Sequence, residues 1–307
     1  MILLRWRLIS ASIIITTLLG LVYLDVNHPL AGVAGVWLVP ISLLAVVAGA
    51  TELLDMLATA GHRPARWPVY TGALLVLAAA SAPLGWQLAG SVYPPDCPLG
   101  KLGWPLAATG CAVLLAFLAE VARYQKPGRA LVDVALSVFA ICYVGLLTSF
   151  LVLLRSFDSP MWGMVALLST ISVVKMSDTG AYTFGRLCGR HKLAPRLSPG
   201  KTIEGLIGGL VTAVATALVW PLVLIPRMIP DSAQSVAGWL VFALLIAAAG
   251  VIGDLSESLL KRDTGCKDSG RWVPGLGGVL DILDSLLFAS PVAFCCWAVG
   301  LVGPTSS

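Results

Sequence analysis

The sequence predicts an all-α polytopic integral membrane protein with about nine transmembrane helices and a cytoplasmic N-terminus. Three observations support this class. Hydrophobic residues make up 58% of the 307 residues, charged residues make up 12%, and the mean hydropathy is +0.90, far from the balance of soluble proteins. Long apolar stretches recur along the chain, and the basic residues are concentrated in alternate loops between them.

A helix that crosses a bilayer needs about 20 mostly apolar residues, and nine stretches meet that need. In chain order they are residues 8–24, 31–50, 69–88, 104–121, 131–154, 161–184, 203–225, 236–260 and 280–301. No small-residue cleavage site follows the first stretch, so we interpret it as an uncleaved anchor. The sixth and eighth stretches end in polar residues that lipid does not tolerate, so we expect those ends to face protein or water.

Basic residues indicate the orientation of these spans. Sixteen of the 20 lysines and arginines fall in connections on one side of the predicted topology. The other four are Lys101, Arg155 and Arg227 on the opposite side, and Lys175 within a span. The positive-inside rule places the basic side in the cytoplasm, which leaves the C-terminus outside. The net charge of +4 follows from this bias, which suits anionic headgroups and phosphates and gives no support for nucleic-acid binding.

The seven cysteines show no sign of a metal site or a disulfide framework. Their number is odd, most lie in predicted spans, and neither a CxxC pair nor a histidine at ligand spacing accompanies them. We interpret them as packing residues or incidental thiols.

Charge divides the membrane domain into two parts. Residues 1–155, with five spans, carry few charges within the membrane and are interpreted as scaffold. Residues 156–307, with four spans and cytoplasmic loops at 185–202 and 261–279, are interpreted as the catalytic part. Seven acids there lie near the predicted cytoplasmic ends of the spans: Asp178, Glu204, Asp254, Glu257, Asp268, Asp281 and Asp284. Ionisable residues at such depths usually face a protein interior or a water-filled cavity, so we expect a polar active-site cavity.

The spacing of these acids predicts two carboxylate faces. Asp281 and Asp284 share one helical face just after the Gly277–Gly278 break. The other face carries, at helical spacing, Asp254, Glu257, Ser258 and Lys261. If the faces converge, their oxygen ligands suit Mg²⁺, which usually takes one or two carboxylates and completes its shell with water and phosphate. Basic residues that can neutralise phosphate in the same cavity are Lys201, Arg262, Lys267 and Arg271.

Each of these features also has a simpler interpretation. The face from residue 254 to residue 261 could be an ordinary ion-paired helix end, and the glycine-rich stretch before Asp281 could simply be a turn. Lys175 and Asp178 could form an internal ion pair instead of belonging to the cavity. The SPGKT sequence at 198–202 is not a Walker A motif, because Pro195 stands where that motif needs glycine.

Two blocks of sequence match family motifs at fixed spacing. In the first, twelve positions agree: Ser258, Lys261, Arg262, Lys267, Asp268, Gly270, Val273, Pro274, Gly277, Gly278, Asp281 and Asp284. In the second, D-[ST]-G-A-Y, S-P-x-K-T and E-G elements stand at 178–182, 198–202 and 204–205. Through these residues the chain resembles the phosphatidate cytidylyltransferases, or CDP-diacylglycerol synthases. The resemblance covers the last four spans closely and the N-terminal half only by hydropathy. Leu276 and Ile282 depart from the pattern, which has His and Arg there, but the acids and lysines are intact, so we expect an active enzyme.

The resemblance implies transfer of a cytidylyl group from CTP to phosphatidic acid within a lipid bilayer, as a step of phospholipid biosynthesis. It further implies a bacterial inner membrane location with the site facing the cytoplasm. Catalytic residues would be Asp254, Lys261, Asp268, Asp281 and Asp284, with Asp254, Asp281 and Asp284 as Mg²⁺ ligands. Substrate would contact Asp178, Ser198, Lys201, Thr202, Glu204, Ser258, Arg262, Lys267, Arg271, Gly277 and Gly278. A second, monovalent cation such as K⁺ and a homodimer stay open.

Two other functions compete with this interpretation. The chain could be a CTP-dependent nucleotidyltransferase or kinase that acts on another lipid. It could also be a secondary transporter, because polar residues at broken spans mark transport sites. Against transport, the acids gather near one membrane surface instead of the midplane, and no pair of interrupted spans repeats between the halves.

Overall fold

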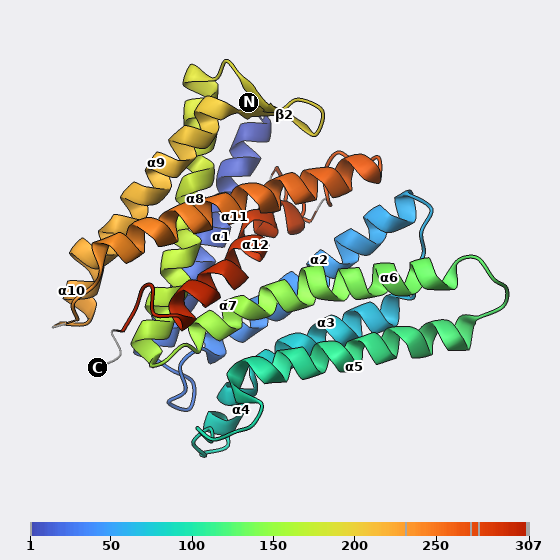
Figure 1. The fold of residues 1–307 in the computed structure, drawn as a ribbon, viewed down its shortest axis with the longest axis horizontal. Coiled ribbons are helices and arrows are strands. Elements are labelled where there is room, and N and C mark those ends of the chain that lie inside the picture. The colour runs from blue at the N-terminus through green and yellow to red at the C-terminus, as the bar shows by residue number, and fades with distance from the viewer. Residues whose placement is uncertain (1, 231, 271, 276, 305–307) are drawn as a thin grey trace. The chain divides into compact units, whose positions relative to one another are not determined.

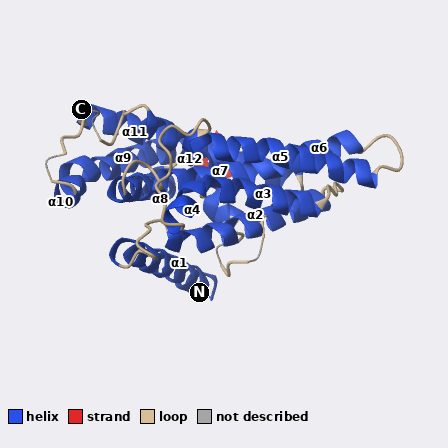
Figure 2. Cartoon of the chain, turned by 90° about the horizontal axis from the view of Figure 1, so that it is seen from below, coloured by secondary structure: helices blue, strands red, loops and turns tan. Residues whose placement is uncertain are grey.

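The structure is a computed structural model that describes residues 2–230, 232–270, 272–275 and 277–304. Within these residues nearly all regular structure is helical, and the strands form one small hairpin (Figure 2). The helices are α1 (Ile2–Asn27), α2 (Val39–Thr59), α3 (Arg66–Ala80), α4 (Ala82–Leu88), α5 (Gly100–Arg123), α6 (Ala130–Ala140), α7 (Leu147–Arg155), α8 (Pro160–Cys188), α9 (Ile203–Val219), α10 (Ile225–Met228), α11 (Val236–Asp263) and α12 (Leu280–Ala298) (Figure 1). The hairpin pairs β1 (Lys192–Ala194) with β2 (Ser198–Thr202) in antiparallel register.

The predicted class is confirmed: this is an all-α polytopic membrane protein. Within the described ranges, eight helical segments are long and apolar enough to cross a membrane. A ninth is formed by α3 and α4, which meet the same criterion as a pair but are bent by 58°. Two of the segments are continuous through a π-helical turn, Ile141–Leu146 between α6 and α7 and Trp220–Leu224 between α9 and α10.

The chain divides into two compact units. The first contains residues 1–156 and 263–282, and the second contains residues 157–262 and 283–307. The segment 263–282, which carries much of the first signature block, therefore belongs with the N-terminal spans. The functional division of the sequence into scaffold and catalytic part stays a prediction.

In the first unit, hydrogen bonds show which connections share an end. Arg123 and Arg129 donate to the backbone carbonyls of Arg63 at 3.2 Å and of Gly61 at 2.6 Å. The α2–α3 connection therefore lies beside the α5–α6 connection. Both connections are rich in arginine, as expected for loops on one side of a membrane.

The opposite end of the first unit shows how α3 and α4 run. Lys101 Nζ donates to the Ser156 carbonyl at 2.7 Å, so the start of α5 lies beside the end of α7. The α3–α4 pair leaves from the arginine-rich end and connects to α5 at this other end, alongside α5 itself (Figure 1). The bent pair therefore traverses the unit, which supports one bent ninth span.

The same opposite end is fixed by a buried ion pair. The carboxylate of Asp25, at the end of α1, contacts the Arg155 guanidinium and accepts a hydrogen bond from the Gly35 backbone amide at 2.7 Å. Both charged side chains are buried. Breaking such a pair by removing one partner typically costs about 3–5 kcal/mol, because the other charge is left buried and unpaired.

In the second unit, small residues bring α8 and α9 into close contact. A side chain at Gly208 would overlap the Phe184 ring, and one at Gly205 would meet the Ala181 backbone carbonyl at 2.7 Å. A side chain at Gly180 would overlap Thr212. Glycines at such an interface let helix backbones approach closely in membranes. This packing fixes the base of the β1–β2 hairpin, which joins the two helices.

Candidate active site

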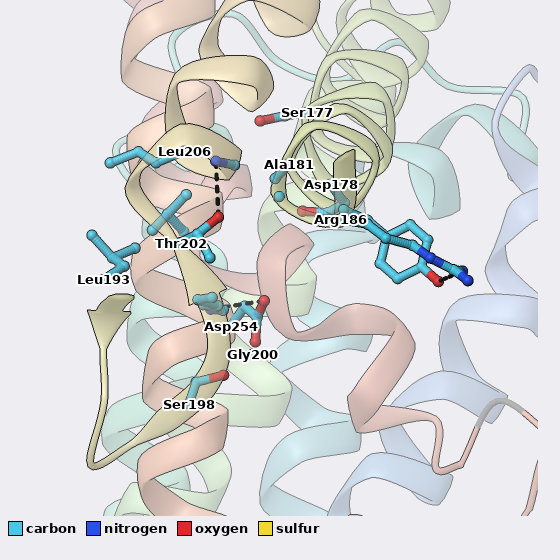
Figure 3. A pocket seen from close by; sticks show the side chains of 15 residues that line it. Ser177, Asp178, Ala181, Arg186, Leu193, Ser198, Gly200, Thr202, Leu206 and Asp254 are labelled. Atoms are coloured by element: carbon cyan, nitrogen blue, oxygen red, sulfur yellow. Dashed lines mark hydrogen bonds and ion pairs between the residues drawn. The ribbon is translucent and has the colours of Figure 1, made fainter. Parts of the chain in front are cut away.

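A pocket in the second unit lies between α8, the β1–β2 hairpin, α9 and α11 (Figure 3). Its volume of about 540 Å³ is within the usual range for small-molecule sites. Five of the residues predicted from the sequence to contact metal or substrate line it: Asp178, Ser198, Lys201, Thr202 and Asp254. The second sequence block therefore meets Asp254 of α11 in one cavity.

An ion pair between the hairpin and α11 forms one wall of this pocket. Lys201 Nζ lies 2.8 Å from Asp254 Oδ2, and both side chains are only partly exposed. The hairpin is held in place at both ends: Thr202 caps α9 by accepting from the Gly205 amide at 3.1 Å, and Arg262 Nε donates to the Leu197 carbonyl at 3.3 Å. A lysine and a carboxylate are therefore presented together on rigid elements.

Asp178 links α8 to α12 within the second unit. Its Oδ2 accepts from Lys175 at 3.3 Å, and its Oδ1 accepts from the Ser285 hydroxyl at 3.3 Å. The simpler interpretation of Lys175 and Asp178 as an ion pair is therefore compatible with the cavity interpretation, because Asp178 both pairs with the lysine and lines the pocket.

Asp284 extends this acidic group. Its side chain is 8% exposed, and it interacts electrostatically with Lys175, Asp254 and Asp178. The approach is close because Gly253 contacts the Asp284 backbone carbonyl, which leaves no room for a side chain there. The second unit thus gathers three acids, and Lys175 and Lys201 are the lysines paired with two of them.

The other predicted residues of α11 differ in their contacts and exposure. Glu257, 1% exposed, pairs with Lys261 at 2.8 Å, which is the ordinary helix-end pair considered above. Asp254 is not part of that pair, since it contacts Lys201. Ser258 is partly exposed on α11, and the Arg262 side chain is exposed.

Glu204 faces the hairpin backbone. Its carboxylate accepts from the Arg190 amide at 3.0 Å and lies 2.6 Å from His191 Nδ1. Glu204 is not among the residues that line the pocket, and its contacts position the start of the hairpin beside α9.

In the first unit, Asp281 is held by the loop that precedes α12. Its Oδ2 accepts from the Gly278 amide at 2.7 Å, from the Ser269 hydroxyl at 2.9 Å and from the Ser269 amide at 3.3 Å. Gly277 has a φ of +98°, which favours glycine, and the loop is fastened to α1 by a 2.7 Å bond from Ser10 Oγ to the Pro274 carbonyl.

The rest of the loop is partly described. Lys267 and Asp268 are exposed, and Ile282, one of the two departures from the family pattern, is partly buried on α12. Arg271 and Leu276 lie outside the described residues. The substrate contact of Arg271 and the departure at Leu276 therefore stay predictions from the sequence.

Two polar residues at these sites, Glu52 and Ser285, were not predicted from the sequence. Glu52 on α2 is 2% exposed and contacts the loop that holds Asp281, whereas the N-terminal spans were interpreted as scaffold. Ser285 contacts Asp178 from α12, a contact that the sequence does not predict, whereas the contact of Asp178 with Lys175 was considered above. Glu52 could have been found, because an acid within an apolar stretch of membrane length is costly and usually has a specific partner.

The side chains that could coordinate a metal ion show whether the site fits one. Among the described residues, no group of three His, Cys, Asp or Glu side chains is placed to hold one. Mg²⁺ usually needs only one or two carboxylates, with water and phosphate oxygens as the other ligands. The pocket of the second unit is lined by the carboxylates of Asp178 and Asp254, with no histidine or cysteine, so the chemistry of its donors fits Mg²⁺.

Comparison with known proteins identifies similar sequences. The family model described as the cytidylyltransferase family matches residues 5–299. The phosphatidate cytidylyltransferase of Haemophilus influenzae is 42% identical over 132 residues, which are 43% of this chain and 45% of that protein. The phosphatidate cytidylyltransferase of Staphylococcus saprophyticus is 41% identical over 162 residues, 52% of this chain and 57% of that protein. The uncharacterized protein YnbB of Escherichia coli is 40% identical over 140 residues, 44% of this chain and 45% of that protein. The chain thus spans about half the length of these curated relatives.

Proposed function

Because the chain belongs to the cytidylyltransferase family, we propose that it is a phosphatidate cytidylyltransferase, which converts CTP and phosphatidic acid to CDP-diacylglycerol and pyrophosphate. The observation that carries this proposal is the Lys201–Asp254 pair in a small-molecule pocket built from the second signature block and α11. Family membership leaves the transporter alternative without support. A related lipid phosphate as acceptor is the remaining competitor.

In the proposed reaction a phosphate oxygen of phosphatidic acid attacks the α-phosphorus of CTP. A new P–O bond forms there, the bond to the β-phosphate oxygen breaks, and pyrophosphate leaves. The acceptor phosphate is already anionic, so little general-base help is needed. The rate then depends on positioning the two anions in line and on neutralising their charge.

The charge of each residue determines what it contributes to this reaction. Lys201, with Ser198 beside it in the pocket lining, holds the phosphatidate phosphate or covers CTP. Lys261, Arg262 and Lys267 hold the triphosphate and the leaving pyrophosphate. Asp254, with Asp284 near it in the second unit, would hold Mg²⁺, which when bound neutralises phosphate charge, and the sequence predicts the same role for Asp281 and Asp268 of the first unit.

The direct test is pyrophosphate release from CTP by the purified protein with Mg²⁺, with and without phosphatidate. We expect release that depends on phosphatidate, with CDP-diacylglycerol as the lipid product. Polyprenyl and archaeol-type phosphates serve as competing acceptors. Leu276→His and Ile282→Arg together should change the rate only modestly, because we expect both departures to be packing substitutions. An inert natural chain beside an active double variant would contradict the proposal.

We further propose that the site faces the cytoplasm of a bacterial cell, as the loop charges predict. Two native thiols test this orientation, because Cys266 lies in the signature loop and Cys97 lies in the α4–α5 connection; both are partly exposed. In intact spheroplasts, a membrane-impermeant maleimide should label Cys97 and spare Cys266 until the membrane is permeabilised. Labelling of Cys266 from the outer face, read by site-resolved mass spectrometry, would refute the orientation.

A further inference from the structure

A buried carboxylate in the N-terminal spans reaches the signature loop. Glu52 lies on α2, about 10 Å before the end of that helix at a rise of about 1.5 Å per residue. Its Oε1 accepts from the Val279 amide at 2.8 Å, and its Oε2 accepts from the Leu280 amide at 2.8 Å. The Ser269 hydroxyl lies 3.3 Å from Oε2. All these residues belong to the first unit.

These contacts place Glu52 at the start of α12, which begins at Leu280. The first amides of a helix have no partner within it, and the positive end of the helix dipole lies there. Glu52 satisfies two of these amides from a distant helix. A buried carboxylate is costly unless hydrogen bonds compensate it, so the pairing stabilises both partners.

The same contacts connect Glu52 to Asp281. The Ser269 hydroxyl lies between the two acids, 3.3 Å from Glu52 Oε2 and 2.9 Å from Asp281 Oδ2. Gly278 and Val279, adjacent in the chain, donate their amides to Asp281 and to Glu52 respectively. One short turn is therefore held between a carboxylate of α2 and a carboxylate of α12.

Two signature glycines lie against the Glu52 carboxylate. A side chain at Gly270 would overlap Glu52 Oε1, and one at Gly278 would overlap the Ser269 hydroxyl and come within 2.5 Å of Glu52 Oε2. The space that a larger residue would need is filled by Glu52. Gly270 and Gly278 therefore pack directly against the Glu52 side chain.

We infer that Glu52 is a positioning residue for Asp281. Glu52 fixes the first turn of α12 and the groups that donate to Asp281, which are the Ser269 hydroxyl and amide and the Gly278 amide (the Ser269–Gly278 cradle). In this way it sets the orientation of the Asp281 carboxylate. It acts through these groups and is not assigned a contact with substrate. The inference rests on the proposed function only where it uses turnover and the proposed metal role of Asp281; the geometry of the loop is independent of it.

The chemistry of the contacts predicts which substitutions succeed. The two backbone amides that contact Glu52 can only donate hydrogen bonds, so the two oxygens of a carboxylate satisfy them and a side-chain amide, with one acceptor oxygen, does not. In Glu52→Gln, one amide nitrogen faces a backbone N–H, and one helix amide loses its acceptor. Outer-shell groups that orient a metal ligand typically contribute 10–100-fold to metal affinity or activity. We expect Glu52→Gln to lower kcat or to raise the Mg²⁺ concentration for half activation by 10-fold or more.

The matched control is Glu120→Gln. Glu120 is also a buried acid of the N-terminal spans, but its ion pair is with Arg123 in the same helix. We expect the kcat and the Mg²⁺ requirement of Glu120→Gln to stay within about 2-fold of the values of the natural protein. Loss of activity in both variants to the same extent would make the Glu52 effect a general cost of removing a buried charge and would overturn the inference.

A second measurement needs neither substrate nor metal. Cys266 lies in the segment that Glu52 holds, so its alkylation rate reports how well that loop is fixed. We expect alkylation of the metal-free protein to be at least 3-fold faster in Glu52→Gln and unchanged in Glu120→Gln. An inert natural protein would end the functional proposal, while this measurement would still decide the inference.

Ser269→Ala keeps the test decisive if Glu52→Gln does not fold. It removes the hydroxyl between the two acids but keeps the Ser269 amide that Asp281 accepts. We expect a raised Mg²⁺ requirement and faster Cys266 alkylation, both smaller than for Glu52→Gln. If Ser269→Ala, or a folded Glu52→Gln, leaves both readouts unchanged, Glu52 has no positioning role.

Discussion

Replacing Asp254 or Asp281 with asparagine is expected to lower turnover by at least about 10²-fold, the scale of losing one preorganised electrostatic stabiliser of a charged transition state. Asparagine keeps the size of each side chain and removes its charge. Asp254 faces the pocket beside Lys201, and Asp281 is oriented by the Ser269–Gly278 cradle. Pyrophosphate release at saturating CTP and phosphatidate, repeated over a range of Mg²⁺ concentrations, measures the effect.

Asp55→Asn is the control for loss of an acid elsewhere. Asp55 forms an exposed ion pair with Arg66 at 2.6 Å in the first unit, and exposed pairs contribute little. Its turnover should be near that of the natural protein, and all three variants should insert into membranes normally. Near-normal turnover of both Asp254→Asn and Asp281→Asn would end the assignment of these two residues to a metal site.

Lys201→Met is expected to lower turnover by about 10²-fold, because the pocket then loses its phosphate-neutralising ammonium and leaves Asp254 without the lysine beside it. Methionine keeps most of the apolar stem of lysine, so the hairpin should stay folded. Measuring kcat and KM separately for CTP and for phosphatidate shows which substrate Lys201 holds, since a residue that binds one phosphate raises the KM of that substrate most.

The same hairpin supplies the control for Lys201. Lys192 is an exposed lysine on β1, paired in register with Thr202 on β2. Lys192→Met removes an equal charge from the hairpin outside the pocket lining, and its kcat and KM should change less than about 2-fold. Equal losses in the two variants would show that the overall charge of the hairpin matters, and not the position of Lys201 in the pocket.

The membrane class was predictable from composition, and so were most of the spans, because a bilayer demands about 20 apolar residues whatever the fold. The bend in the third span could not be predicted from composition. Residues 69–88 contain no charged residue, yet the helix breaks at Ser81, just before Pro83, and bends by 58°. Hydropathy averages over a window and does not report the direction of the helix axis.

The candidate site was predictable only in part. The acids of α8, α11 and α12 could be grouped from the sequence because charges near a membrane collect in polar cavities. Which of these residues pair with one another could not be predicted. Helical spacing pairs Asp254 with Glu257 and Lys261, whereas in the structure Asp254 contacts Lys201 on a strand. Glu52 shows the same limit, because its partners are 217 to 228 residues away.

That separation has a consequence for biosynthesis. At about 5–20 residues per second, the ribosome adds Ser269 and the start of α12 roughly 11 to 45 s after Glu52. During this interval the acid of α2 has none of these loop donors, and a buried polar group without hydrogen bonds is costly. Arrival of the final segment therefore supplies partners to a helix made much earlier. A chain that stops before this loop and α12 therefore carries in its second span an acid that lacks these hydrogen-bond donors.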